Sequence, residues 1–322
     1  MTELTSDNPA ILQLLPRLGN DDAGVRRIAL IDLADLEDPD GVPWLIAALA
    51  DDPSEEVRAQ AASLLEAWEE QAVVEGLCRA LADPDHSVRG AAAQSLSQVK
   101  TAEAGRVILP WAEHADVFVR SSALRALREL RLAESVPVAL KALVDSQASV
   151  RREAVGILGW LKQATAVAQL ARLVSGDPDT EVRRVAAGAL GFASSAPVLQ
   201  ALVAALGDSQ WQVREEAATT LGKLGLLDAG PALVGALSDN YWQVRLRAAR
   251  SLGKLAYADA LPGLVELLEH AISNLRKEAA LALGELADPA AIIALQAREN
   301  DSDPEVRKAV RISLTQLRGG HR

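Results

Sequence analysis

A valine-arginine pair recurs along the chain at steps of 31 or 32 residues. The ten copies begin at Val25, Val57, Val88, Val119, Val150, Val182, Val213, Val244, Leu275 (leucine in place of valine) and Val306, each followed by arginine. A fixed period of this length indicates a repeat architecture, in which each copy is one supersecondary unit packed on the next. The period is therefore better evidence for the fold than the chain length is, because 322 residues would otherwise suggest about two globular domains.

Other positions keep the same register when each copy is numbered from its valine as offset 0. Offset 4 is alanine in nine copies and Val310 in the tenth, and offset 8 is leucine in all ten. Offsets 0, 4 and 8 share one face of an α-helix. Seven copies carry aspartate at offset −5, which predicts a turn or a helix N-cap ahead of that helix.

The half of each copy before this aspartate predicts another helix. Pro43, Pro137, Pro231 and Pro262 suit a first helical position, where the missing N–H costs nothing. Glycines at offset 9 are expected to relieve crowding or assist the helix exit; they are Gly159, Gly191, Gly222, Gly253 and Gly284. A two-helix copy buries its apolar face only against its neighbours.

We therefore predict an all-α fold, an α-solenoid in the form of a right-handed superhelix. It has about ten two-helix repeats and roughly 20 helices. The expected layout is one continuous solenoid over residues 8–318, a disordered N-terminus at 1–7 and a C-terminal tail at 319–322.

Composition narrows the function classes. Lys and Arg number 33 against 44 Asp and Glu, a formal charge of −11, which disfavours nucleic acid as a partner. The single cysteine, Cys78, excludes an intrachain disulfide and a thiolate-rich metal site. No apolar run reaches about 18 residues, and the start "MTELTSDNPA" lacks the pattern of a signal peptide. We expect a cytoplasmic monomer that binds no membrane.

The segment "DPDTEVRRVAAGALG", residues 177–191, resembles the HEAT-repeat family, and in particular the HEAT-like repeats of phycobilin lyases. The resemblance extends from about Pro9 to Leu317. It implies the solenoid fold and leaves function to individual sites.

The recurring arginine at offset 1 and aspartate at offset −5 admit two interpretations, a phosphate-binding face or a ladder between copies. We favour the ladder, because the two residues recur in fixed phase and a guanidinium fork suits a carboxylate.

No catalytic constellation emerges, and we predict neither enzyme activity nor a cofactor or metal. The histidines are His86, His114, His270 and His321. His114 and His270 occupy the aspartate slot five copies apart, so we interpret them as polar turn residues. The HEAT-like deoxyhypusine hydroxylases hold iron through His-Glu pairs, but no histidine precedes Glu153, Glu216 or Glu278 here. Cys78 is expected to be a small buried residue.

Binding residues should lie where packing leaves the second helices free, at offsets 2, 3, 6 and 10. Aromatic residues concentrate in copies five to eight, with Gly156 and Gly188 expected to leave bare backbone beside them. The predicted partner-binding residues are Trp160, Phe192, Trp211, Tyr241, Trp242, Arg152, Arg184, Glu216, Arg247 and Arg250. Aromatics with arginine are typical of protein-binding hot spots, although Trp211 and Trp242 are equally compatible with packing between copies. Ile28, Ile31 and Ile312 also fall at such offsets, which we attribute to drift of the register at the ends.

These features favour a non-catalytic scaffold, adaptor or assembly factor that holds a protein partner in a concave groove. One alternative is a bilin lyase or chaperone subunit, in which Trp160, Arg152 and Arg184 contact the bilin. Another is an accessory subunit of a metal- or cluster-dependent enzyme.

Overall fold

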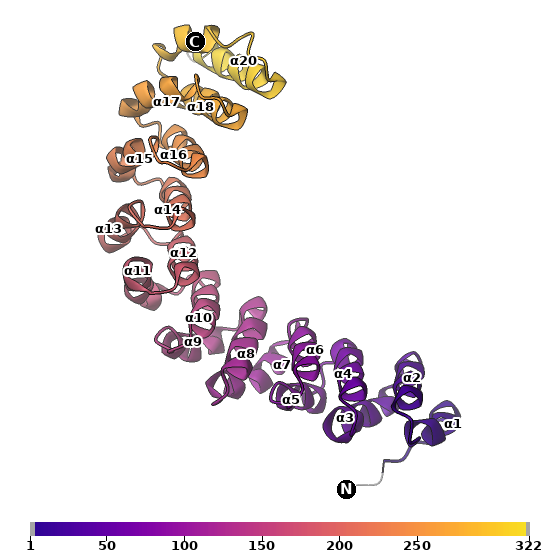
Figure 1. Cartoon of the computed structure of the whole chain (residues 1–322). Coiled ribbons are helices and arrows are strands. Elements are labelled where there is room, and N and C mark those ends of the chain that lie inside the picture. Colours follow the sequence, from indigo (N-terminus) through magenta and orange to yellow (C-terminus); the bar gives the residue numbers. More distant parts are fainter. Residues whose placement is uncertain (1–3, 320–322) are drawn as a thin grey trace. The chain divides into compact units, whose positions relative to one another are not determined.

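The computed structural model describes residues 4–319, and within them the chain consists of helices joined by turns and short irregular segments (Figure 1). Twenty α-helices and seven short 3-10 helices occur between these residues. The predicted all-α solenoid of two-helix repeats is therefore confirmed. Residues 1–3 and 320–322, parts of the two expected tails, lie outside the described residues.

The chain divides into two compact units, Met1–Leu161 and Lys162–Arg322, with five helix pairs in each. The first helices of the pairs in the first unit are α1 (Pro9–Leu18), α3 (Val42–Asp51), α5 (Gln71–Ala80), α7 (Ala102–Ile108) and α9 (Val136–Ala142). The second helices are α2 (Ala23–Ala34), α4 (Glu55–Leu64), α6 (His86–Leu96), α8 (Val117–Leu130) and α10 (Ala148–Trp160). One continuous domain and a right-handed superhelix stay predictions.

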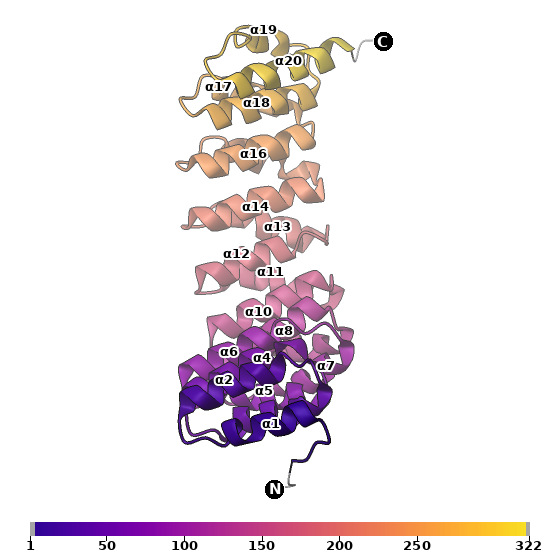
Figure 2. The same ribbon diagram turned by 90° about the vertical axis from the view of Figure 1, so that its right-hand side faces the viewer.

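The second unit repeats the same pairing. Its first helices are α11 (Val167–Gly176), α13 (Ala196–Ala205), α15 (Gly230–Ala236), α17 (Leu261–Leu267) and α19 (Ala291–Gln296). Its second helices are α12 (Thr180–Ala189), α14 (Trp211–Leu224), α16 (Trp242–Lys254), α18 (Ser273–Leu286) and α20 (Pro304–Gly319). Within each unit, each second helix contacts its own first helix and the second helices beside it, and Figure 2 shows α14, α16 and α18 stacked side by side.

The core of each copy follows the predicted helix face. Val213, Ala217 and Leu221, at offsets 0, 4 and 8 of α14, are all fully buried. Their spacing places them on one stripe of the helix, which packs against the first helix and the neighbouring copies. Burial of such aliphatic side chains supplies most of the stability of a repeat stack.

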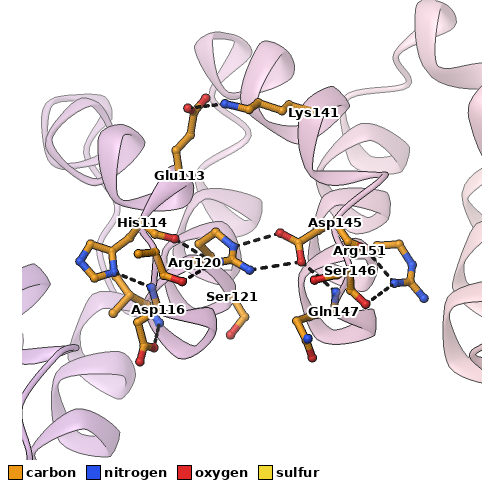
Figure 3. Close-up of polar contacts among 12 residues, drawn as sticks. Glu113, His114, Asp116, Arg120, Ser121, Lys141, Asp145, Ser146, Gln147 and Arg151 are labelled. Atoms are coloured by element: carbon orange, nitrogen blue, oxygen red, sulfur yellow. Dashed lines mark hydrogen bonds and ion pairs between the residues drawn. The ribbon is translucent and has the colours of Figure 1, made fainter.

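The aspartate at offset −5 lies in the turn between the two helices and not at the N-cap. The backbone N–H of Gln147 donates to Asp145 at 2.8 Å, and the same carboxylate accepts hydrogen bonds from Arg120 Nε and Nη2 at 3.0 and 3.2 Å. Nη1 of Arg120 donates to the backbone carbonyl of His114 at 2.9 Å (Figure 3). One arginine thus joins its own turn to the turn of the next copy.

This contact recurs, which confirms the interpretation of the arginines and aspartates as a ladder. We call each such pair a rung. Further rungs join Arg26 to Asp52, Arg58 to Asp83, Arg183 to Asp208, Arg214 to Asp239 and Arg276 to Asp301. Because rung side chains are largely buried, for example 12% and 11% exposed at Arg183 and Asp208, water screens them little.

Five of the rungs lower the pKa of their aspartates. The hydrogen bond from Arg276 is the largest cause at Asp301. At Asp208, burial alone would raise the pKa, but the hydrogen bonds from Arg183 and from the N–H of Gln210 outweigh it. The pKa values of Asp52, Asp83 and Asp239 are lowered in the same way.

Glycines at offset 9 allow close approach of neighbouring second helices. A Cβ atom at Gly222 would lie 2.1 Å from Ser251 Oγ and 2.9 Å from Ser251 Cα. The Ser251 hydroxyl donates to the carbonyl of Ala218 at 2.8 Å, which ties α16 to α14. Of the two roles expected for these glycines, relief of crowding applies at Gly222, whereas the left-handed residue that ends α14 is Gly225, with φ of +67°.

Substituting Asp208→Asn should destabilise the protein by about 3 kcal/mol, because it leaves Arg183 partly buried without its counter-charge. Urea unfolding followed by circular dichroism measures the change. Asp228→Asn, at an exposed aspartate outside the ladder, is the matched control and should shift stability by less than about 0.5 kcal/mol. Equal effects of the two substitutions would contradict a stabilising rung.

Acid should weaken the ladder. An aspartate with a lowered folded-state pKa contributes stability that is present above its ordinary pKa of about 3.9 and lost as pH falls through the folded value. The urea midpoint should therefore drop as pH is lowered from about 5 to 3. The Asp208→Asn protein should show a smaller drop, which isolates the rung from other titrating groups; a drop of the same size in both proteins would argue against it.

Gly222→Ala should lower the free energy of unfolding by about 1–3 kcal/mol, because the new methyl group overlaps Ser251 and forces the helices apart. Gly235→Ala provides the contrast, since a Cβ there has no neighbouring atom within 4 Å. That change should be neutral or stabilise α15 by up to about 1 kcal/mol. Thermal unfolding of both proteins tests the difference in sign.

Candidate partner-binding surface

Three predicted aromatic residues lie together at the turns that begin α14 and α16. Trp211 is the first residue of α14, Tyr241 is the N-cap of α16, and Trp242 is the first residue of α16. The rings of Trp211 and Tyr241 stack with centroids 5.6 Å apart and planes 14° from parallel. We call these three residues the aromatic cluster.

The ladder holds the aromatic cluster in place. The N–H of Tyr241 donates to Asp239 at 2.8 Å, and Arg214, the rung partner of Asp239, has its guanidinium carbon 5.5 Å from the centre of the Tyr241 ring. Tyr241 and Trp242 nevertheless remain 46% and 37% exposed, and Trp211 is half-buried. Packing and surface presentation therefore coexist in this cluster.

Trp160 is the last residue of α10 and is 55% exposed, which confirms the prediction that it lies on a solvated face. Its cationic neighbour is Arg131, whose guanidinium lies over the ring at 4.5 Å, a favourable cation–π contact. Sequence reasoning missed Arg131, which caps α8 in a left-handed conformation. Arg152 lies 3.8 Å from Glu153 instead.

Phe192 lies in the turn after α12 and is half-buried. It is in the second unit, as is the aromatic cluster, whereas Trp160 belongs to the first. Within the second unit the aromatic cluster lies at the starts of second helices and Phe192 follows the end of one. A helix such as α14 is about 20 Å long, so the structure does not gather Phe192 into the cluster.

The predicted charged residues of the second unit form pairs, most of them between copies. The contacts join Arg184 to Glu181 at 2.8 Å and to Glu216 at 3.7 Å, Arg247 to Glu215 at 3.0 Å, and Arg250 to Glu278 at 2.7 Å. Burial raises the pKa of Glu216, and the nearby Arg184 only partly offsets it. These side chains fasten second helices together as well as lining their surface.

Some expectations about exposure are wrong. A Cβ at Gly156 would lie 2.7 Å from Arg128 Cδ, and one at Gly188 would lie 2.7 Å from Glu216 Oε1. Both spaces are filled by side chains of a neighbouring copy and are not open to a ligand.

Offset 3 is likewise not uniformly exposed, since Glu153 and Glu278 are 2% and 4% exposed and pair with Arg128 and Arg250. Drift of the register is also wrong for Ile28 and Ile312, which are 50% and 43% exposed as their offsets require. Ile31 is half-buried.

The histidine and cysteine sites have structural explanations. Nδ1 of His114 and of His270 accepts a backbone N–H two residues on, at 3.0 Å in each case, which confirms both as turn residues. His86 begins α6, and His321 lies outside the described residues. Cys78 is buried, and burial, followed by the nearby Glu75, raises the pKa of its thiol to about 12. Residues 4–319 hold no group of three or more His, Cys, Asp or Glu suited to a metal ion.

Sequence reasoning also missed an acidic surface in the first unit. A cleft of about 780 Å³ is lined by Asp35, Glu37, Glu66, Glu69 and Trp68, with Lys100 its basic member. Residues 1–161 contain 26 Asp and Glu against 15 Lys and Arg, whereas residues 162–322 contain 18 of each. Counting charge by unit, and not over the whole chain, would have revealed it.

No helix among the described residues has the length and apolarity to cross a membrane.

Comparisons with known proteins agree with this architecture. Curated protein sequences include no significant match to the chain. Solved structures similar to it include an engineered protein (23% identity, 97% of this chain and 99% of that one, TM-score 0.55) and YibA of Escherichia coli (20% identity, 83% and 98%, TM-score 0.63).

A third similar structure is Kap95p, described in a complex with RanGDP, at 15% identity and a TM-score of 0.65. The match covers 95% of this chain and 49% of Kap95p. At such identities the likeness is one of fold alone. A family model for HEAT repeats matches residues 9–97, 42–118, 105–191, 172–244 and 230–315. With nearly the whole chain covered by these matches, the protein belongs to the HEAT-repeat family.

Proposed function

We propose that this protein is a non-catalytic scaffold or adaptor that holds a partner protein against its second helices, with the aromatic cluster as the main contact. The observation that carries the proposal is the exposure of Tyr241 and Trp242 beside the stacked Trp211. In a chain with only 3% aromatic residues, such grouping is a feature that core packing does not require.

Two physical properties suit the cluster to protein binding. Aromatic rings with a nearby arginine are the residues that most often dominate binding energy at interfaces. The stacking of Trp211 on Tyr241 and the rung beneath them fix the rings before any partner arrives, so little side-chain entropy is lost on association. HEAT-repeat solenoids commonly serve as protein-binding scaffolds, and the likeness to Kap95p is compatible with that use.

The bilin alternative has less support. It requires Trp160 to act with Arg152 and Arg184, but Arg152 lies 3.8 Å from Glu153 and Arg184 is bound to Glu181 at 2.8 Å. Arg131 is the residue that covers Trp160.

In our proposal the protein works as a monomer without a cofactor. Sedimentation analysis of the purified protein tests the oligomeric state, and metal analysis tests the absence of a bound metal.

Affinity capture from the native organism, followed by mass spectrometry, tests the proposal. The wild type should retain a partner that the double variant Trp211→Ala, Trp242→Ala loses at least tenfold, since two hot-spot rings together contribute more than about 1.4 kcal/mol. Leu227→Ala is the matched control, because it truncates an apolar residue that is 60% exposed away from the cluster. Partner lists that are the same for the wild type and the double variant would contradict the proposal.

A further inference from the structure

One rung of the ladder in the second unit lacks its carboxylate. On either side of it, Arg214 binds Asp239 through Nε and Nη2 at 2.6 and 2.9 Å, and Arg276 binds Asp301 at 2.8 and 2.7 Å. Between them, Arg245 belongs to a junction where the next copy presents His270 in place of aspartate. His270 uses Nδ1 to accept the N–H of Ile272, the bond that the aspartate accepts elsewhere.

Arg245 makes different hydrogen bonds from the arginines of complete rungs. In complete rungs, Nη1 donates to the carbonyl six residues back and Nε turns to the aspartate. In Arg245, Nε itself donates to the carbonyl of Asp239. Among residues 4–319, no carboxylate lies within ion-pair distance of this half-buried guanidinium. Its two Nη groups are therefore left to water or to a ligand.

At the other histidine junction, the arginine finds substitute partners for the missing aspartate. Arg89 faces His114, but its Nη2 donates to Asp116 at 3.0 Å and its guanidinium lies 4.5 Å over the ring of Phe118. The positions equivalent to Asp116 and Phe118 in the copy of His270 are Ile272 and Asn274. Neither can replace the missing charge, so Arg245, unlike Arg89, has no carboxylate partner among the described residues of its junction.

The surroundings of Arg245 favour an acidic group from outside. The nearby carboxylate of Asp239 is already held by Arg214 and by the N–H of Tyr241, and Glu269 is paired with Arg298. The exposed rings of Tyr241 and Trp242 precede Arg245 by four and three residues, which is about one turn of α16. A free guanidinium beside exposed rings suits a carboxylate attached to an apolar group.

We propose that a partner protein completes this rung, with an aspartate or glutamate that binds Arg245 and an adjacent aromatic or large apolar residue that packs on the aromatic cluster. This inference rests on the proposed function and names the chemistry of the partner. A peptide carboxylate fits better than a phosphate, because the arginines of the two neighbouring rungs, Arg214 and Arg276, each bind a carboxylate with two-point geometry.

Nuclear magnetic resonance of the arginine Nε–H groups in the full chain tests the site, with N-acetylphenylalanine as the probe. This probe carries one carboxylate and one ring. The Nε–H signal of Arg245, assigned with Arg245→Gln, should shift saturably with a dissociation constant of about 1–10 mM, as expected for so small a ligand. The amide N-acetylphenylalaninamide and inorganic phosphate should each bind at least tenfold more weakly.

Two variants supply the missing charge from within the chain. His270→Asp restores the usual rung, and Ile272→Asp reproduces the contact that Asp116 makes with Arg89. Both should fold at least as stably as the wild type and bind the probe at least tenfold more weakly. An unmoved Arg245 signal, equal binding of the amide or phosphate, or unchanged probe binding by His270→Asp would each overturn the inference.

The same variants separate this inference from the proposed function. If affinity capture loses the partner with the Trp211→Ala, Trp242→Ala protein but keeps it fully with His270→Asp, the scaffold function stands and the completed rung is wrong. Loss of that partner with His270→Asp as well, at undiminished stability, supports both.

Discussion

The hydrogen-bonded ion pair between an arginine of one copy and an aspartate of the next sets the arrangement of each unit. Apolar burial at offsets 0, 4 and 8 drives copies together, but it is non-directional. The rung adds direction, because Nε and Nη2 of Arg183 meet both oxygens of Asp208 while Nη1 holds the carbonyl of Asp177. Each aspartate also accepts the N–H that closes its own turn, so the turn and the neighbouring copy are fixed by the same carboxylate.

The position of the aromatic cluster depends on one of these ion pairs. Arg214 contributes to a rung and lies beside the ring of Tyr241, and Tyr241 follows the aspartate of that rung by two residues. Rings attached to such a turn are presented rigidly although they are exposed. The proposed binding surface is therefore a by-product of the packing that holds copies together, with large side chains added where the turn leaves room.

Most of the fold could be predicted from the sequence because its determinants are periodic. The spacing of Val213, Ala217 and Leu221 predicts a buried helix face. The fixed positions of Arg183 and Asp208 within their copies predict a rung. The features that could not be predicted are side-chain contacts that depend on the residues at one particular junction between copies. The burial of Glu153 depends on Arg128 of the preceding copy, and the cover on Trp160 depends on Arg131 in a left-handed turn. Arg128 and Arg131 do not recur in register, so no pattern signals their contacts. The pairing of Glu153 with Arg125, by contrast, recurs in register between Glu278 and Arg250.

Gly222 and Ser251 illustrate how finely neighbouring copies are matched, yet each such match involves only adjacent copies. Asp208 and Asp239 are one period apart, and each serves the arginine of the copy before it. Excision of one full period between them would set Asp239 opposite Arg183, in the place that Asp208 vacates. A gene encoding such a chain can thus lengthen or shorten by whole copies without inventing a new kind of junction, provided that glycine and serine partners are exchanged together.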